Sequence, residues 1–215
     1  MRSPMNDEMS RRRGRPPGKP ETNPAERILD AAAESFATHG SRGASMRTIA
    51  DAAGMRAPSI YNHFASKDEL LIAVGKRYFA ALVPELQAAS RMPGSGVERL
   101  EHLIRVATAV STAHPFDHLT MVRELMQVRR EPGAESLVAD GQRCIAIWHL
   151  VIRRGQADGS LRRDITPAGM TWLIFTAITG LTDPGRRADI LGDPSTRNVD
   201  TLCAVLIDGA RPVSR

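Results

Sequence analysis

The chain has 215 residues, enough for one large or two small domains, and only 4% are aromatic, a composition that favours helices over strands. The net charge is +5, a modest excess that argues against a uniformly basic coat. No apolar run opens the chain, and the longest, around residues 172–181, is far below the roughly 20 residues that span a bilayer. We therefore expect no secretory signal, no membrane span and a cytoplasmic protein.

Residues 1–23 hold much of the positive charge. Six basic and three acidic side chains give this segment +3, which leaves +2 for the other 192 residues. The segment is rich in Pro, Gly and Arg and has no apolar period, so we predict a disordered basic arm. Its centre, RRRGRPPGK, resembles an AT-hook core that would insert Arg13 and Arg15 into a narrow minor groove. A tail that binds phosphates without preference is the alternative.

A first helix is predicted from Pro24, behind the cap residue Asn23, to Gly40. The next stretch, SMRTIADAAGMRAPSIYNHFASK, predicts two short helices joined by a tight turn. Ser45 can cap the first of them, and Gly54 can adopt the positive φ that the turn requires. This layout is that of a helix-turn-helix, in which the second helix contacts bases.

The second short helix should present a small polar face to the outside. Ile60 and Phe64 are four residues apart and define its buried side, so Asn62 and its neighbours point outward. Asn can pair bidentately with adenine, and a Tyr hydroxyl or a Lys ammonium can reach a phosphate. An ordinary helical corner with a solvated face is the alternative. The candidate DNA contacts are Ser45, Arg47, Thr48, Ala57, Pro58, Ser59, Tyr61, Asn62, His63 and Lys67, with Arg13 and Arg15 of the arm.

Over residues 24–78 the chain resembles the DNA-binding domain of the TetR/AcrR family of transcriptional regulators. The matching pieces are FATHG, IADAAG, the turn, IYNHF and SKDELL, in this order and at fixed spacing. The resemblance implies an all-α protein with a three-helix DNA-binding domain, residues 24–70, and a helical effector-binding and dimerisation domain, residues 71–215. It also implies a homodimer on a pseudo-palindromic operator and a ligand pocket in the second domain.

The rest of the chain predicts further helices. Their expected ranges are 67–90, 97–113, 115–130, 135–158, 167–181 and 198–209, with loops at 92–96 and 183–195. Ser66 and Glu69 form a capping box, and Pro84 should kink the helix that follows. The stretch CIAIWHLVI in residues 135–158 is apolar nearly all round, so this helix should lie centrally in the second domain.

The helix from Pro167 has two apolar stripes, one on Met170, Leu173 and Ile178 and the other on Trp172 and Phe175. Two apolar faces imply burial against the chain's own core and against something else, and the family layout favours a four-helix dimer seam over a deep single-chain core. The candidate dimer residues are Trp172, Phe175, Ile178, Leu202, Val205 and Leu206.

A ligand pocket has several candidate lining residues, although such a list more often belongs to plain core. Their apolar character favours a hydrophobic or aromatic effector, with histidines as polar anchors. The candidates are His102, His118, Met121, Leu125, Cys144, Trp148, His149 and Phe175.

Other chemistry finds little support. His114 and His118 flank Asp117, but no HExxH pattern or Cys cluster accompanies them, so we expect no metal. Cys144 and Cys203 are expected to be buried thiols, and Cys144 and His149 do not share a helix face, so catalysis and a cofactor are not expected. The sequence predicts a DNA-binding regulator, in first place a repressor. An architectural DNA-binding protein without an effector and an enzyme on a helical scaffold are the alternatives.

Overall fold

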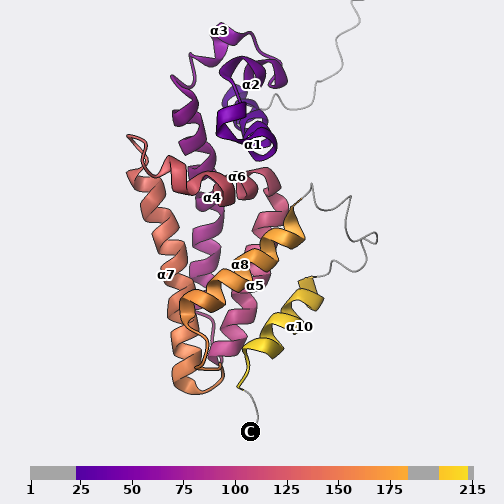
Figure 1. Cartoon of the computed structure of the whole chain (residues 1–215), viewed down its shortest axis with the longest axis vertical. Coiled ribbons are helices and arrows are strands. Elements are labelled where there is room, and N and C mark those ends of the chain that lie inside the picture. The colour runs from indigo at the N-terminus through magenta and orange to yellow at the C-terminus, as the bar shows by residue number, and fades with distance from the viewer. Residues whose placement is uncertain (1–22, 184–198, 213–215) are drawn as a thin grey trace, which may run out of the picture.

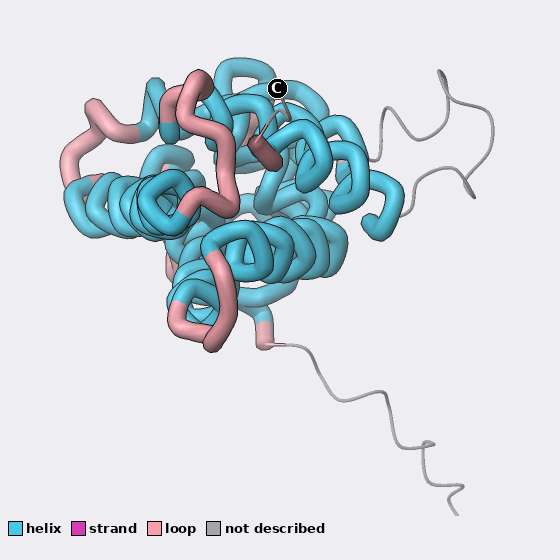
Figure 2. The backbone as a smooth tube through the Cα atoms, turned by 90° about the horizontal axis from the view of Figure 1, so that it is seen from below, coloured by secondary structure: helices cyan, strands magenta, loops and turns pink. Residues whose placement is uncertain are grey.

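The computed structural model describes residues 23–183 and 199–212, except for the side chains of Leu125 and Met126. All the regular elements in this part of the chain are helices (Figure 1, Figure 2). The predicted basic arm with Arg13 and Arg15, and most of the predicted loop at 183–195, lie outside the described residues. The helices are α1 (Pro24–Gly43), α2 (Met46–Ala52), α3 (Ala57–Ile60), α4 (Lys67–Ser90), α5 (Gly96–Ala113), α6 (Pro115–Val128), α7 (Glu135–Asp158), α8 (Pro167–Thr182) and α10 (Val199–Ala210).

The N-terminal helices gather at one end of the molecule. Figure 1 shows α1, α2 and α3 around the start of α4, while α5 and α7 pack along its other half and α8 and α10 pack on α5. Phe36, Ile49 and Ile60 are fully buried and form the centre of the small N-terminal group. The long helix α4 is continuous across residue 70, where the sequence predicts the domain boundary, so the two groups share one rigid element.

Side-chain caps begin most of the helices, as the sequence predicts. Asn23 accepts from the amide of Ala25, and Ser45 Oγ accepts from the amide of Thr48 at 3.1 Å. Ser66 Oγ accepts from the amide of Glu69 at 3.1 Å, but the Glu69 carboxylate turns to the amide of Ala65 rather than to that of Ser66. These bonds satisfy donors that a helix start otherwise leaves without partners.

Three expectations need correction. The predicted end of the first helix at Gly40 corresponds to a kink with φ 72° inside α1, after which a last turn continues to Gly43. The helix expected to extend to Phe64 ends at Ile60 and is continued by hydrogen-bonded turns. The helix α7 is not buried all round, because Ile145 and Leu150 are exposed on its outer side. The apolar sequence of this helix did not show that only one of its sides packs on the core.

Candidate functional site

The outer surface of the α2–α3 corner carries the predicted DNA contacts. Ile60 has no exposed surface and fixes α3 from behind, while the amides of His63 and Phe64 donate to Ile60 O at 3.0 Å. The turn that follows therefore holds Tyr61, Asn62 and His63 outward on a rigid base. Tyr61 is 54% exposed, and Asn62, His63 and Pro58 are exposed too, whereas Ala57 and Ser59 are half-buried.

The start of α2 contributes exposed groups beside this surface. Thr48 Oγ1 donates to Ser45 O at 2.9 Å, and Ser45 and Thr48 exchange backbone-to-side-chain bonds as a capping box. Both residues stay exposed, as does Arg47. Hydroxyls and a guanidinium at this position can contact phosphates.

Two side chains support the corner from below. Gly54 has φ 68°, and the Arg27 guanidinium donates to Ala53 O, a carbonyl at the end of α2. Lys67 Nζ donates to Ala44 O at 3.1 Å and is half-buried, so in the unbound chain it braces the turn before α2. A phosphate contact by Lys67 has to use its remaining donors. The sequence did not predict the role of Arg27, because nothing in the pattern of an amphipathic helix shows that a surface Arg donates to a carbonyl 26 residues away.

A second group of functional candidates is buried between α4, α5, α6 and α8, around His118. Its Nδ1 lies 2.8 Å from Tyr78 Oη and 3.3 Å from Ser111 Oγ, and its Nε2 lies 3.1 Å from Thr179 Oγ1. The Thr179 hydroxyl donates its own proton to Phe175 O at 2.8 Å, so it accepts from His118 Nε2–H. Nδ1 then accepts from the Tyr78 hydroxyl, and the network assigns the neutral Nε2–H tautomer.

Burial keeps the polar groups of this region uncharged. It lowers the pKa of His118 to about 4, against an opposing attraction to the Asp183 carboxylate. Burial also raises the pKa of Cys144 to about 12 and raises that of Tyr78. Both cysteines are free thiols, as predicted.

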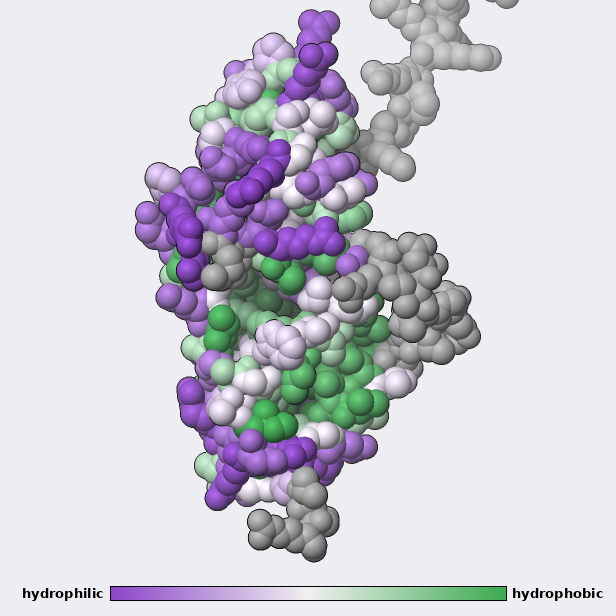
Figure 3. Space-filling view, in the orientation of Figure 1, coloured by the Kyte–Doolittle hydropathy of each residue, from purple (hydrophilic) through white to green (hydrophobic). Residues whose placement is uncertain are grey.

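The predicted pocket residues do not all come together. Trp148 packs edge-on against Phe175 with ring centroids 5.5 Å apart, and Cys144 and Met121 are buried nearby in the same core. His102 instead lies exposed on α5, and His149 is half-buried. The side chain of Leu125 is outside the described part. Figure 3 shows the surface hollowed below α6, with apolar residues on its floor.

Two buried polar atoms near these rings have unmet hydrogen-bonding capacity. Trp148 Nε1 approaches the Cys144 thiol but lacks a hydrogen-bond partner of ordinary geometry, and Thr171 Oγ1 also lacks a partner within the described residues. Thr171 lies one turn before Phe175 on α8. Buried donors are normally satisfied by protein, water or ligand, so these atoms can accept a further partner.

An apolar surface crosses α8 and α10, where the sequence predicts a dimer seam. Trp172 is 66% exposed and Val205 68%, while Phe175, Leu202 and Leu206 are half-buried. Figure 3 shows this apolar area in the lower half of the molecule. The prediction that Ile178 lines the dimer interface is wrong, because at 2% exposure this residue lies inside its own subunit. Leu173, which shares its predicted apolar stripe with Ile178, is exposed next to Trp172.

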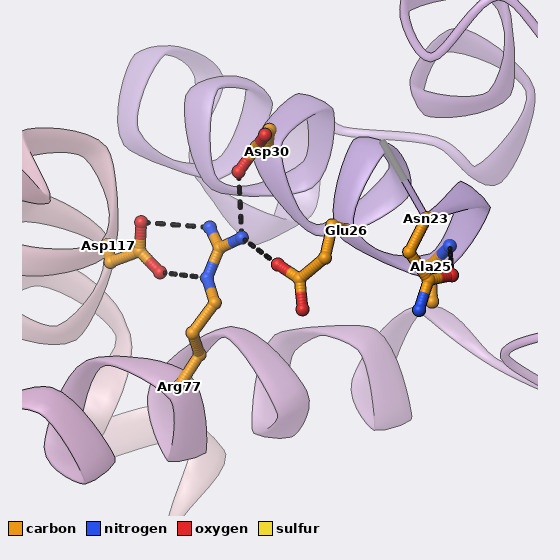
Figure 4. A network of polar contacts seen from close by, with 6 residues as sticks. All are labelled: Asn23, Ala25, Glu26, Asp30, Arg77 and Asp117. Carbon is orange, nitrogen blue, oxygen red and sulfur yellow. Dashed lines mark hydrogen bonds and ion pairs between the residues drawn. The ribbon is translucent and has the colours of Figure 1, made fainter. Parts of the chain in front are cut away.

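Sequence reasoning also missed a polar network that joins the two groups of helices (Figure 4). Arg77 on α4 forms ion pairs with Asp117 on α6 and with Asp30 and Glu26 on α1. Asp117 was noticed only as a neighbour of two histidines. Across the described ranges, no three His, Cys, Asp or Glu side chains cluster as a metal site. Nor does any helix there combine the length and apolar character of a membrane span.

The sequence is similar to those of known transcriptional regulators. Residues 28–74 match the family described as bacterial regulatory proteins, tetR family. The repressor KstR2 of Mycobacterium tuberculosis is 25% identical over 138 residues, 64% of this chain and 69% of its own. The activator FasR of Mycolicibacterium smegmatis is 41% identical over 73 residues, 34% of this chain and 33% of its own.

Solved structures share the whole fold. The ketosteroid transcriptional regulator KstR2 of Mycobacterium tuberculosis superposes with a TM-score of 0.72 at 24% identity, covering 92% of this chain and 99% of its own. AibR, solved in complex with isovaleryl coenzyme A and operator DNA, gives 0.72 at 16% identity over 89% and 100% of the two chains. With the exposed helix-turn-helix, these likenesses identify the chain as a DNA-binding transcriptional regulator whose residues 28–74 match the tetR family.

Proposed function

We propose that the protein represses transcription by binding, as a homodimer, to a pseudo-palindromic operator. The observation that carries this proposal is the exposed row Pro58, Tyr61, Asn62 and His63, held rigidly over the buried Ile60. Two such rows on a dimer would enter successive major grooves about 34–36 Å apart. Asn62 would contact a base, and Tyr61, Arg47 and Lys67 would contact phosphates.

The dimer would form through α8 and α10. Exposed Trp172, Leu173 and Val205 form an apolar surface that would cost free energy if left in water, and a two-fold axis would cover it with its own copy. Sedimentation of a Trp172→Lys, Val205→Lys double variant tests this assignment. We expect the variant to be monomeric at concentrations where the parent protein is dimeric; a dimeric variant would disprove it.

The effector would be a small molecule with an uncharged apolar portion. Its binding region would be the apolar hollow below α6, and we propose Cys144, Trp148 and Phe175 of the same core as its lining. His118 and Cys144 are neutral there, so a buried ligand charge would find no partner among them. Trp148 Nε1 could donate to a ligand carbonyl. The ketosteroid transcriptional regulator KstR2, and AibR in its complex with isovaleryl coenzyme A, are consistent with a ligand that has such an apolar portion.

Repression would end because the effector binds better to a conformer with a different separation of the two DNA-reading domains. The domain division at residue 70 and the basic arm belong to the same proposal. The arm would add phosphate contacts, and Arg13 and Arg15 would reach a minor groove beside the operator.

Selection of duplexes from a random DNA pool tests the DNA-binding function directly. We expect the protein to enrich a pseudo-palindrome and to bind it about a thousandfold tighter than random duplex, the lower end for specific regulators. Repression is then tested with this sequence in front of a reporter gene. Equal affinity for all duplexes would instead indicate an architectural DNA-binding protein and would refute the proposal.

A further inference from the structure

The helix α6 is fastened to α1 at both ends of α1. Near the start of α1, Arg77 acts as a bridge: its Nε and Nη2 donate to the Asp117 carboxylate at 2.8 and 3.0 Å, and its Nη1 donates to Asp30 at 2.7 Å (Figure 4). Nη1 also donates to Glu26 at 3.3 Å. The paired bonds to one carboxylate fix the plane of the guanidinium, so they orient α6 against α4 and α1.

Near the end of α1, a second carboxylate of α6 also holds α1 against α6. Glu124 is buried and accepts from the amide of Ser41 at 2.9 Å and from its hydroxyl at 2.7 Å. Ser41 follows the kink at Gly40, directly before the turn that leads into α2. Between the two anchors, Thr120 Oγ1 donates to Ala33 O at 3.1 Å.

These anchors determine the direction of α1. Asp30 and Ala33 lie on the straight part of α1, so their bonds to Arg77 and Thr120 hold its axis against α4 and α6. Ser41 lies beyond the kink at Gly40, so its bonds to Glu124 hold the last turn of α1, which leads into α2. Because α2 packs on α1 and α3 packs on α2, the outward face of Asn62 is held in the same orientation.

The helix α6 is also joined to α4 and α8. His118, next to Asp117, bonds to Tyr78 of α4 and to Thr179 of α8. The helix α8 carries the exposed Trp172 and the half-buried Phe175. Hydrogen bonds therefore join α8 to His118 of α6, and the neighbouring Asp117 joins α6 through Arg77 to α1.

We propose that Asp117 and Glu124 are positioning residues for operator binding, which set the orientation of the helix-turn-helix relative to the α8–α10 surface. This inference rests on the proposed dimeric function. In a dimer, this orientation determines the separation and rotation of the two DNA-reading surfaces, and therefore the half-site spacing that the protein accepts. Neither residue touches DNA, so their effect differs in kind from that of Asn62.

The test compares half-site spacings on the full-length protein. The probe is the duplex that the parent protein selects from a random pool, together with versions whose centre is one or two base pairs longer or shorter. Each base pair turns one half-site by about 34–36° relative to the other. The variants are Asp117→Asn, Glu124→Gln and the pair Glu26→Gln, Asp30→Asn. The last of these releases α1 but retains the Arg77–Asp117 ion pair. Glu101→Gln, which breaks the Arg105–Glu101 ion pair on α5, is the control.

We expect the parent protein and Glu101→Gln to lose about tenfold or more in affinity for each changed spacing. The Glu26→Gln, Asp30→Asn variant should lose less than about threefold, because a released α1 can adjust to either spacing. These two side chains are largely exposed, so this variant tests the inference even where Glu124→Gln fails to fold. Undiminished discrimination between spacings, or an equal loss on every duplex, would overturn the inference. A parent protein that selects no duplex would overturn the proposed function itself.

Discussion

Replacement of His118 by Gln should remove much of the loss of stability that the protein undergoes as the pH falls. Burial lowers the pKa of His118 from 6.5 to about 4. The unfolded chain therefore takes up a proton below pH 6.5 that the folded chain accepts only near pH 4. The stability associated with neutral His118 is complete above pH 6.5 and is lost as the pH falls towards 4.

The size of the effect follows from the two pKa values. Each pKa unit between the two states corresponds to about 1.4 kcal/mol, so the full loss is about 3 kcal/mol. Between about pH 7.5 and pH 5, roughly 2 kcal/mol of it should appear. A loss of this size is a substantial fraction of the 5–15 kcal/mol or so typical of a folded protein.

Urea unfolding at these two pH values, at one fixed protein concentration, measures the difference. The parent protein should lose about 2 kcal/mol more than His118→Gln over this range. His63→Gln, on the exposed turn after α3, should retain the full loss and serves as the matched control. If His118→Gln lost as much stability as the parent protein, the buried neutral His118 would not account for the pH dependence.

Three further predictions concern packing and DNA contact. Gly96→Ala should destabilise by about 1–3 kcal/mol or more in thermal unfolding, because its Cβ would lie 2.0 Å from Gly155 Cα; Gly209→Ala, with open space around it, should cost nothing. A normal melting temperature for Gly96→Ala would contradict the close approach of α5 and α7. Asn62→Ala should relax preference at one base position, and Tyr61→Phe should weaken binding to all sequences alike, both measured by fluorescence anisotropy. Unchanged binding would remove either residue from the contact surface. Deletion of residues 1–20 should weaken binding and flatten its salt dependence, and an unchanged salt slope would show that the arm makes no phosphate contact.

Local patterns predicted most of the helices and the outward face of α3. Asn23, Ser45, Ser66 and Thr166 all cap helices in the structure, since a cap depends on residues within one turn of it. Errors arose where exposure depends on distant packing. Ile178 and Leu173 share one predicted apolar stripe, yet one is buried and the other exposed.

The amino-acid sequence by itself determined the helix-turn-helix, because turn residues, caps and the Ile60–Phe64 spacing act over a few residues and need no distant partner. Only the tertiary structure decided which polar groups meet. Arg77 is 40 residues from Asp117 and 51 from Glu26, and Ser41 is 83 from Glu124. No local pattern relates residues so far apart; their contact depends on how α1, α4 and α6 pack, and that packing joins the DNA-reading surface to the rest of the protein.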